Sequence, residues 1–172
     1  QEDGSLVAWG FNNRGQSIIP FGLAGVTAIS SGYYHNLALG SDGLVTAWGS
    51  NDFGEATVPA NLDRAIAVAA GWRHSLALRE DGTVAAWGLN SRGQTRVPAG
   101  LGDVVAISGG GEHSLALKDD GTVVAWGRNN RGQTRVPADL TGVIAISAGF
   151  DYSLALKDDG TVVGWGNDIG IP

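Results

Sequence analysis

The sequence contains no cysteine and no methionine. The lack of cysteine excludes a disulfide framework and any metal site built from thiolates. Because methionine is missing, we expect that Gln1 follows a cleavage, or that the chain is an excerpt of a longer or an engineered protein. No apolar run approaches the ~20 residues of a membrane-spanning helix, and the first residues show no signal-peptide pattern. Contact with a membrane is therefore not expected.

Charged residues are also scarce, at 16% of the chain, and the net charge is −6. A surface that binds nucleic acid normally shows as net positive charge or a basic stripe, so this balance disfavours nucleic acid as a partner. Hydrophobic residues make up 43% of the chain, which is enough for a core and argues against disorder. Glycine, with 28 residues, is the abundant type, and its regular spacing marks turns.

The dominant pattern is a repeat of 39 residues. Its most regular stretch is Asp120–Gly127, which reads Asp-Gly-Thr-Val-Val-Ala-Trp-Gly. Related stretches bring the number of copies to five in all. The tryptophans near the ends of the copies are spaced evenly, without insertion or deletion. They are Trp9, Trp48, Trp87, Trp126 and Trp165. Periods of 20–50 residues are typical of solenoids and propellers.

Four short strands are predicted for each unit. The first is an apolar run such as 104–107, and the second alternates Leu with Ala or Ser, as in 114–117. An Asp-Gly pair then predicts a type I′ hairpin leading to the third strand, 122–126. The fourth segment, 135–137, ends in proline, which lacks an N–H donor and indicates an edge strand.

The predicted fold is therefore all-β, a β-propeller of 39-residue, four-stranded blades, because four antiparallel strands repeated radially describe a blade. A β-solenoid is the alternative, although its repeats are usually shorter and parallel. We predict a single domain over residues 1–172, with about four and a half repeats. The units are about 1–25 (partial), 26–64, 65–103, 104–142 and 143–172 (eroded). This number indicates a partial propeller, or a ring completed by a second chain.

Residues 71–94 and 110–133 carry the pattern Gly-x-x-His-Ser-Leu-Ala-Leu-x-x-Asp-Gly-x-Val-x-Ala-Trp-Gly-x-Asn-x-x-Gly-Gln. This pattern resembles the repeat of the regulator of chromosome condensation family, which implies a propeller, usually of seven blades. The short repeat with Val-Pro at its end, as in 51–59, is similar to the compact bacterial members, among them an inhibitor of beta-lactamases. In that inhibitor, aromatic residues on loops grip the partner. The resemblance favours a bacterial, secreted or cell-surface protein.

The residues that recur in every unit are interpreted as structural. For the five tryptophans we favour filling of the space between blades. A chromophore array is the alternative, because 71–75 is similar to a motif of a plant ultraviolet photoreceptor in the same family, but only one unit carries it. His35, His74 and His113 occupy equivalent positions in successive blades, too far apart to share an ion at the ~2 Å of a Zn–N bond. We expect them to bond to backbone at a turn, and we predict no metal site.

Motifs for catalysis are missing. The sequence has no Gly-x-Ser-x-Gly, no His-Glu-x-x-His and no phosphate-binding loop. The Asp-Gly pairs lack the twelve-residue loop of a calcium site and are better explained as hairpin turns. We therefore predict no catalytic residue, no cofactor and no enzyme activity.

Two sets of positions vary between units while the frame stays constant. One set precedes the histidine position, and the other lies in the turn after the third strand. Because the first and third strands of an antiparallel blade run in the same direction, we expect both sets on one face. Tyr, Trp and Arg dominate binding hot spots, so this face predicts protein binding. The candidate residues are Tyr33, Tyr34, Trp72, Arg73, Glu112, Phe150, Asp151, Arg14, Phe53, Arg92 and Arg131.

The function predicted from these features is a non-catalytic protein-protein interaction module, with an inhibitor-like binding protein as its more specific form and a partner of unknown identity. One alternative is a structural or engineered repeat fragment that self-assembles, with a second copy or the missing blades of a parent chain completing the ring. Another alternative is a guanine-nucleotide exchange or chromatin factor, which would need a basic tail or a wedge insertion. A phosphate-binding role for the arginines competes with solvated turn charges, which neighbouring acids favour.

Overall fold

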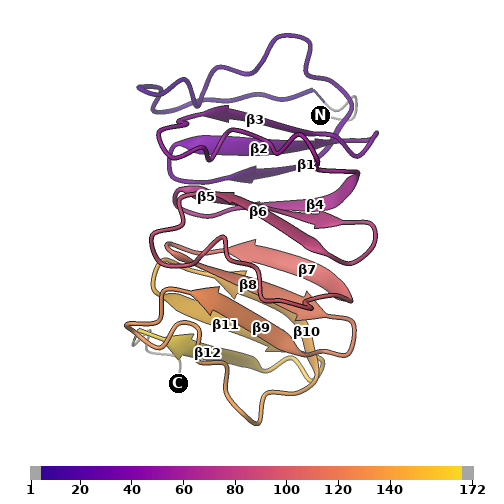
Figure 1. The fold of residues 1–172 in the computed structure, drawn as a ribbon, viewed down its shortest axis with the longest axis vertical. Coiled ribbons are helices and arrows are strands. Elements are labelled where there is room, and N and C mark those ends of the chain that lie inside the picture. Colours follow the sequence, from indigo (N-terminus) through magenta and orange to yellow (C-terminus); the bar gives the residue numbers. More distant parts are fainter. Residues whose placement is uncertain (1–4, 168–172) are drawn as a thin grey trace.

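The computed structural model describes residues 5–167, which form strands, turns and loops and no helix. Within this range no helix is long and apolar enough to cross a membrane. The strands make four antiparallel sheets of three, in the orders β1-β2-β3, β4-β5-β6, β7-β8-β9 and β10-β11-β12, which we name blades 1 to 4 (Figure 1). The strands are β1 Val26–Ser31, β2 His35–Gly40, β3 Val45–Gly49, β4 Ala65–Ala70, β5 His74–Arg79, β6 Val84–Gly88, β7 Val104–Gly109, β8 His113–Lys118, β9 Val123–Gly127, β10 Val143–Ala148, β11 Tyr152–Lys157 and β12 Val162–Gly166.

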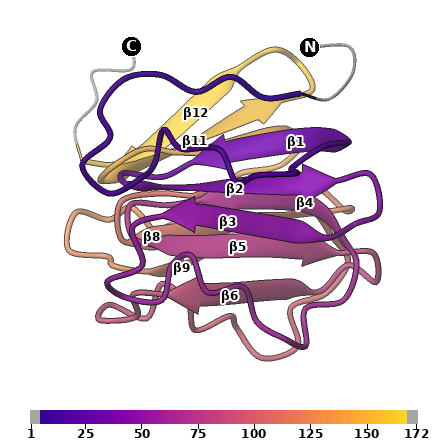
Figure 2. The ribbon, with the colours of Figure 1, turned by 90° about the horizontal axis from the view of Figure 1, so that it is seen from above.

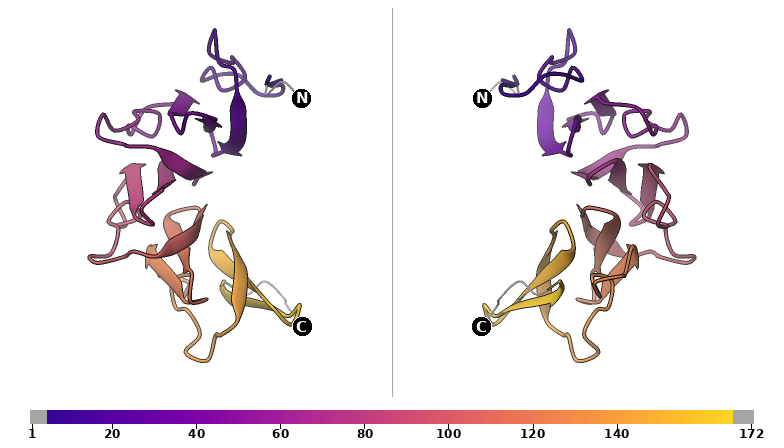
Figure 3. Two further views of the ribbon diagram at one scale, coloured as in Figure 1. Left: turned by 90° about the vertical axis from the view of Figure 1, so that its right-hand side faces the viewer. Right: turned by 90° about the vertical axis from the view of Figure 1, so that its left-hand side faces the viewer.

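The four blades follow one another along an arc, with sheets stacked face to face (Figures 2 and 3). Strand β2 contacts β4, β5 contacts β7, and β8 contacts β10, so each blade packs on the next blade in the chain. The segment 5–25 lies beyond blade 1 at one end of the arc, blade 4 forms the other end, and the side between the two ends is open (Figure 3). The all-β partial propeller predicted from the repeat is confirmed.

The predicted fourth strand of each blade is wrong for the described units. Residues 57–59, 96–98 and 135–137 pair with no strand, and every described sheet has three strands. The valine of this segment instead packs sideways into the core between two blades, as Val97 does beside Val104 and Trp126. Proline at the end of the segment removes a ladder donor, so the segment serves as an apolar connection to the next blade rather than as an edge strand.

The hairpin between the second and third strands also differs from the predicted type I′ turn. In blade 2, Gly82 has a φ of 77°, but none of the aspartates in the four described Asp-Gly pairs, Asp42, Asp81, Asp120 and Asp159, adopts positive φ. The Asp81 carboxylate accepts a hydrogen bond from the N–H of Thr83 at 2.9 Å, which holds the aspartate in a local Asx turn. The connection is therefore a three-residue loop that needs left-handed backbone only at its glycine.

The hydrophobic core lies between blades rather than within one sheet. At the junction of blades 2 and 3, Leu76, Leu78 and Val84 pack against Val104 and Trp126. The junctions of blades 1 and 2 and of blades 3 and 4 contain the equivalent residues. A single unit cannot bury its apolar face alone, so stacking of neighbours supplies the burial that stabilises the fold.

The tryptophans fill these junctions as predicted in blades 2 to 4, where Trp87, Trp126 and Trp165 are 7–8% exposed. The prediction is wrong for Trp9, which is 83% exposed. Trp48 is half-buried. The tryptophan of each later blade packs against the blade before it, and no complete blade precedes blade 1 in this chain. The exposure of Trp9 therefore follows from its place at the end of the arc.

Candidate functional site

A hydrogen-bonded chain of buried side chains ties each blade to the next. The histidine Nε2 lies 3.0 Å from the serine Oγ of the following blade in each of three pairs. The serine Oγ then donates to the carbonyl oxygen of the residue that ends the turn after the third strand, as Ser114 does to Gln94 at 2.9 Å. The indole N–H of Trp126 donates to the same oxygen at 2.8 Å. The histidine pairs are His35 with Ser75, His74 with Ser114, and His113 with Ser153.

This chain fixes the tautomer of the histidines. Because the only serine proton goes to the carbonyl, the imidazole Nε2–H has to donate to the serine oxygen. The Nδ1 atoms of His35, His74 and His113 are then buried acceptors without a hydrogen-bond partner. A backbone group of the next blade also acts on each histidine and partly offsets the lowering of its pKa by burial, in line with the expected bond to backbone, but the serine hydroxyl of the neighbouring blade is a partner that we did not expect.

Burial decides the charge of these histidines, because a protonated Nδ1 would have no acceptor. Burial lowers the pKa of His74 to about 3 and that of His113 to about 4, from an ordinary value of 6.5. The pKa of His35 is lowered by the same cause. All three are neutral at pH 7 and act as structural links. Among residues 5–167 no group of three or more His, Cys, Asp or Glu side chains could hold a metal ion.

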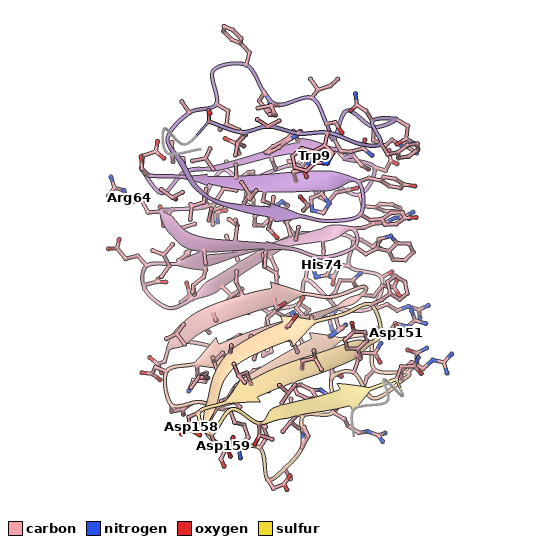
Figure 4. The ribbon with its side chains drawn as sticks, turned by 180° about the vertical axis from the view of Figure 1, so that it is seen from behind. Trp9, Arg64, His74, Asp151, Asp158 and Asp159 are labelled. Carbon is pink, nitrogen blue, oxygen red and sulfur yellow. The ribbon has the colours of Figure 1, made fainter. Side chains whose placement is uncertain are left out.

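The two variable sets of loops meet on one face of the arc. The Arg73 guanidinium carbon, in the loop before β5, lies 4.9 Å from the ring centroid of Phe53, in the turn after β3. The Arg128 Nη1 atom, after β9, lies 2.9 Å from Glu112 Oε2, before β8. Figure 4 shows Asp151 at this face and Asp158, in an Asp-Gly turn, at the opposite face. The antiparallel argument therefore placed both sets correctly.

The centre of this face is a cluster of aromatic rings from three blades. The ring centroids of Tyr33 and Trp72 are 5.7 Å apart, and those of Trp72 and Phe150 are 5.2 Å apart, both with edge-to-face geometry. Tyr34 packs against Tyr33 at 4.3 Å. Blade 3 places Gly111 at the equivalent position, and a Cβ there would overlap the Phe150 backbone oxygen. Glycine in blade 3 therefore leaves room for Phe150 to reach Trp72.

We name this surface the aromatic face: Tyr33, Tyr34, Phe53, Trp72, Arg73 and Phe150. Tyr33, Phe53 and Phe150 are exposed large side chains. Beside them, an open depression of about 330 Å³ is lined by the loops that follow the first strand of each blade. The Arg73 guanidinium carbon also lies 4.8 Å from the Trp72 ring centroid, so this cation stacks against two rings.

Four of the charged candidates, Arg14, Arg92, Glu112 and Asp151, form ion pairs around the aromatic face. Arg14 Nη1 lies 3.1 Å from Asp52 Oδ2, and Arg92 Nε lies 3.8 Å from Glu112 Oε2. Surface pairs of this kind contribute at most about 1 kcal/mol to stability, but they cancel local charge. The interpretation of the arginines as a phosphate-binding stripe is therefore not favoured by the geometry. Arg131, exposed in the turn after β9, donates its backbone N–H to Gln133 Oε1.

Sequence reasoning missed two residues of this region. The Phe11 ring centroid lies 6.3 Å from that of Tyr34, and Arg128 pairs with both Glu112 and Asp151, the latter at 3.7 Å. Both residues directly follow a Trp-Gly pair, where the other units carry different side chains. Variation at this position was the signal that could have identified them.

The model for the regulator of chromosome condensation (RCC1) repeat matches residues 26–55, 65–94, 104–133 and 143–168, more than half of the chain. The chain belongs to this family. No curated protein matches the sequence.

Solved structures show the same fold in RCC1-like propellers. The ectodomain of the receptor kinase CR4 from Physcomitrella patens matches with a TM-score of 0.77 and 24% identity, over 95% of this chain and 47% of its own. Yeast RCC1 (Prp20) bound to Kap60 matches with a TM-score of 0.71 and 23% identity, over 82% and 43%. Human WBSCR16 matches with a TM-score of 0.71 and 27% identity, over 83% and 48%. The chain thus spans about half the length of these relatives.

Proposed function

We propose that this RCC1-repeat chain is a non-catalytic module that binds a protein partner through the aromatic face. The observation that carries the proposal is the cluster of aromatic rings from three blades, in which the exposed rings of Tyr33 and Phe150 pack edge to face against the half-buried Trp72. Contiguous exposed apolar groups of this kind mark interaction sites in soluble proteins. Related propellers support it, since yeast RCC1 is seen bound to the protein Kap60.

Backbone hydrogen bonds hold the loops of the aromatic face in place in the absence of a partner. The backbone N–H of Tyr33 donates to the carbonyl oxygen of Trp72 at 3.3 Å, and the N–H of Trp72 donates to that of Gly110 at 3.0 Å. The N–H of Gly111 donates to the carbonyl of Phe150 at 3.2 Å. These bonds connect the loops of neighbouring blades. A surface ordered in advance loses little side-chain and loop entropy on association, which favours affinity.

The chemistry of the surface fits a protein rather than a nucleic acid. Aromatic rings occupy the centre, and arginines paired with acids form the surroundings, an arrangement found at protein interfaces with an apolar core and a polar rim. Stacked Arg73 and Trp72 are residue types enriched at hot spots. Pairing of Arg14 with Asp52 and of Arg128 with Glu112 reduces the positive field that a phosphate backbone requires.

Within this function we propose an inhibitor-like role in a bacterial, secreted or cell-surface protein, because of the short repeat, the acidic balance and the aromatic turns. An exchange or chromatin role is the second candidate, because yeast Prp20p, which is 20% identical with a TM-score of 0.61, was studied for binding to Gsp1p and histones. The constant 39-residue spacing leaves no wedge insertion among the units, which favours the first candidate.

A binding panel tests the proposal. The immobilised protein is exposed to purified secreted bacterial enzymes, serine beta-lactamases included, and to small GTPases loaded with GDP. For any protein captured, Trp72→Ala and Phe150→Ala should each weaken binding by about 30-fold, the loss expected for a hot spot of ~2 kcal/mol. Leu44→Ala is the matched control, because Leu44 is exposed in an Asp-Gly turn, away from the aromatic face.

The outcomes separate the candidates. Full binding by both alanine variants would contradict the aromatic face as the binding surface. Inhibition of a captured enzyme supports the inhibitor-like role. Faster GDP release from a GTPase would instead establish the exchange role.

A further inference from the structure

The two faces of the arc carry opposite charge. On the face away from the aromatic rings, each described Asp-Gly turn contains one acidic residue more than it contains basic residues, and its carboxylates are exposed. The acidic residues of these turns are Asp42, Glu80, Asp81, Asp119, Asp120, Asp158 and Asp159, and the basic ones are Arg79, Lys118 and Lys157. Figure 4 shows Asp158 and Asp159 together on this face, opposite Asp151. This face is therefore acidic.

The loops on the side of the aromatic face hold most of the arginines. They are Arg14, Arg73, Arg92, Arg96, Arg128, Arg131 and Arg135. Of the four acids in the same loops, Asp52, Glu112 and Asp151 pair with arginines and Glu55 is buried. This side is therefore basic, although the whole chain has a net charge of −6. The ion pairs keep the basic excess moderate, which suits an acidic protein surface better than a phosphate backbone.

Arg73 differs from the paired arginines around it. Its guanidinium carbon lies 4.9 Å from the ring centroid of Phe53 and 4.8 Å from that of Trp72. Among residues 5–167, no carboxylate forms an ion pair with Arg73, whereas Arg14 and Arg128 each have one. The contacts of its guanidinium are therefore those with two aromatic rings at the centre of the basic side.

The buried acid in the turn of Phe53 is already occupied. Glu55 is 1% exposed, and its Oε1 atom accepts a hydrogen bond from Ser50 Oγ at 2.8 Å. Its Oε2 atom accepts one from the backbone N–H of Phe53, also at 2.8 Å. Both carboxylate oxygens thus serve the turn itself. They fix the loop that carries the Phe53 ring, and so they position Arg73 through that ring.

The arrangement around Arg73 prepares it for a carboxylate. A guanidinium that stacks on ring faces keeps its N–H donors in its own plane, where they match the two oxygens of a carboxylate. Stacking on Phe53 and Trp72 also restricts the side chain in advance, so less entropy is lost when the pair forms. The surrounding rings exclude water in a contact, which strengthens a charge-assisted hydrogen bond.

We propose that the protein partner of the aromatic face presents an aspartate or glutamate with apolar neighbours on an acidic surface. Its carboxylate pairs with Arg73, and the apolar neighbours cover Trp72 and Phe150. This inference rests on the proposed binding function and specifies the chemistry of the partner. The basic side attracts such a surface and the acidic Asp-Gly turns repel it, so the partner is steered to the aromatic face. A basic partner would instead leave Arg73 desolvated and unpaired, which costs affinity.

A library of random peptides displayed on phage provides the probe. Peptides are selected on the immobilised full chain and depleted on the Trp72→Ala variant, so that those kept depend on the aromatic face. They should be enriched in Asp or Glu beside apolar residues, and the same selection on Arg73→Glu should enrich Lys and Arg. Dependence on Trp72 without acidic enrichment would overturn this inference alone. Failure to obtain any peptide that depends on Trp72 would contradict the proposed binding function, and this inference with it.

A double-mutant cycle separates ion pairing from simple packing. Arg73→Gln should weaken the best acidic peptide by about 30-fold or more, the effect of leaving a buried charge without its partner. Arg131→Gln is the matched control, because Arg131 is exposed and forms no ion pair among the described residues, and it should cost less than about 5-fold. Circular dichroism checks that both variants fold.

The peptide supplies the other half of the cycle. Replacing its carboxylate by the amide should weaken binding to the wild-type chain as much as Arg73→Gln does. The same replacement should have little further effect on Arg73→Gln, because the pair is already lost. Arg73→Lys keeps the charge but not the planar fork, so it should bind with intermediate affinity. Additive losses, or an Arg73→Gln variant that binds as the wild type does, would overturn the proposal.

Discussion

Acidification should unfold the protein through its buried histidines. The folded-state pKa of His74 is about 3 and that of His113 is about 4, both below the value of 6.5 in an unfolded chain. The unfolded chain therefore takes up protons first as pH falls below 6.5, and the free energy of unfolding decreases from there toward pH 4. Above pH 6.5 the contribution of both histidines is fully present.

The size of the effect follows from the same linkage. At pH 5, a histidine with an unfolded pKa of 6.5 and a folded pKa well below 5 lowers the free energy of unfolding by about 2 kcal/mol. His74 and His113 together give about 4 kcal/mol, and His35 adds to it in the same direction. Asp120 does not contribute in this window, because its lowered pKa affects stability only near and below its ordinary value of 3.8.

Urea unfolding followed by tryptophan fluorescence at pH 7.5 and pH 5 measures the loss. His113→Gln keeps an N–H donor but cannot titrate, so it should reduce the difference between the two pH values by about 2 kcal/mol, whatever its own stability. A wild-type difference below about 1 kcal/mol, or an unchanged difference in His113→Gln, would refute the reasoning.

Two further predictions concern packing. Trp126→Ala should lower the free energy of unfolding by about 3–5 kcal/mol, because it empties a junction and removes the bond to Gln94, whereas Trp9→Ala should change it by less than about 0.5 kcal/mol. Equal effects of the two in urea unfolding would contradict the packing described for them. Gly111→Ala should cost about 1–3 kcal/mol and displace Phe150, because the added methyl overlaps that loop. A crystal structure of this variant with Phe150 still against Trp72 would disprove the need for glycine.

Much of the fold was predictable because a constant repeat length indicates a structural unit of constant size. Even spacing from Trp48 to Trp165 indicates units of equal length, and Asp-Gly turns between alternating runs locate the second and third strands. The fourth strand was not predictable in the same way. The short apolar run that ends at Pro98 has the pattern of an edge strand. Its valine instead packs into the core of the next junction, and this tertiary contact cannot be read from the local sequence.

The face on which the candidate residues lie was predictable from the sequence, but the contacts between their side chains were not. Strand direction alone places the loops of Tyr33, Trp72 and Phe150 together. The contact of Trp72 with Phe150 across blade 3 depends on the curvature of the arc and on the missing side chain of Gly111. The pairing of His74 with Ser114 had a signal that was not used, since serine recurs 40 residues after each histidine.

The histidine-to-serine bond has a consequence for how such a protein can grow, because blades 2 and 3 each contain both the histidine and the serine. A duplicated 39-residue unit, inserted at any junction, brings its own acceptor for the histidine before it and its own histidine for the serine after it. Gene duplication can therefore lengthen the protein without a compensating mutation at the new boundary. Blade 1 has Asn36 in place of the serine and blade 4 has Tyr152 in place of the histidine, so a copy of blade 2 or blade 3 is the unit that can be inserted in this way.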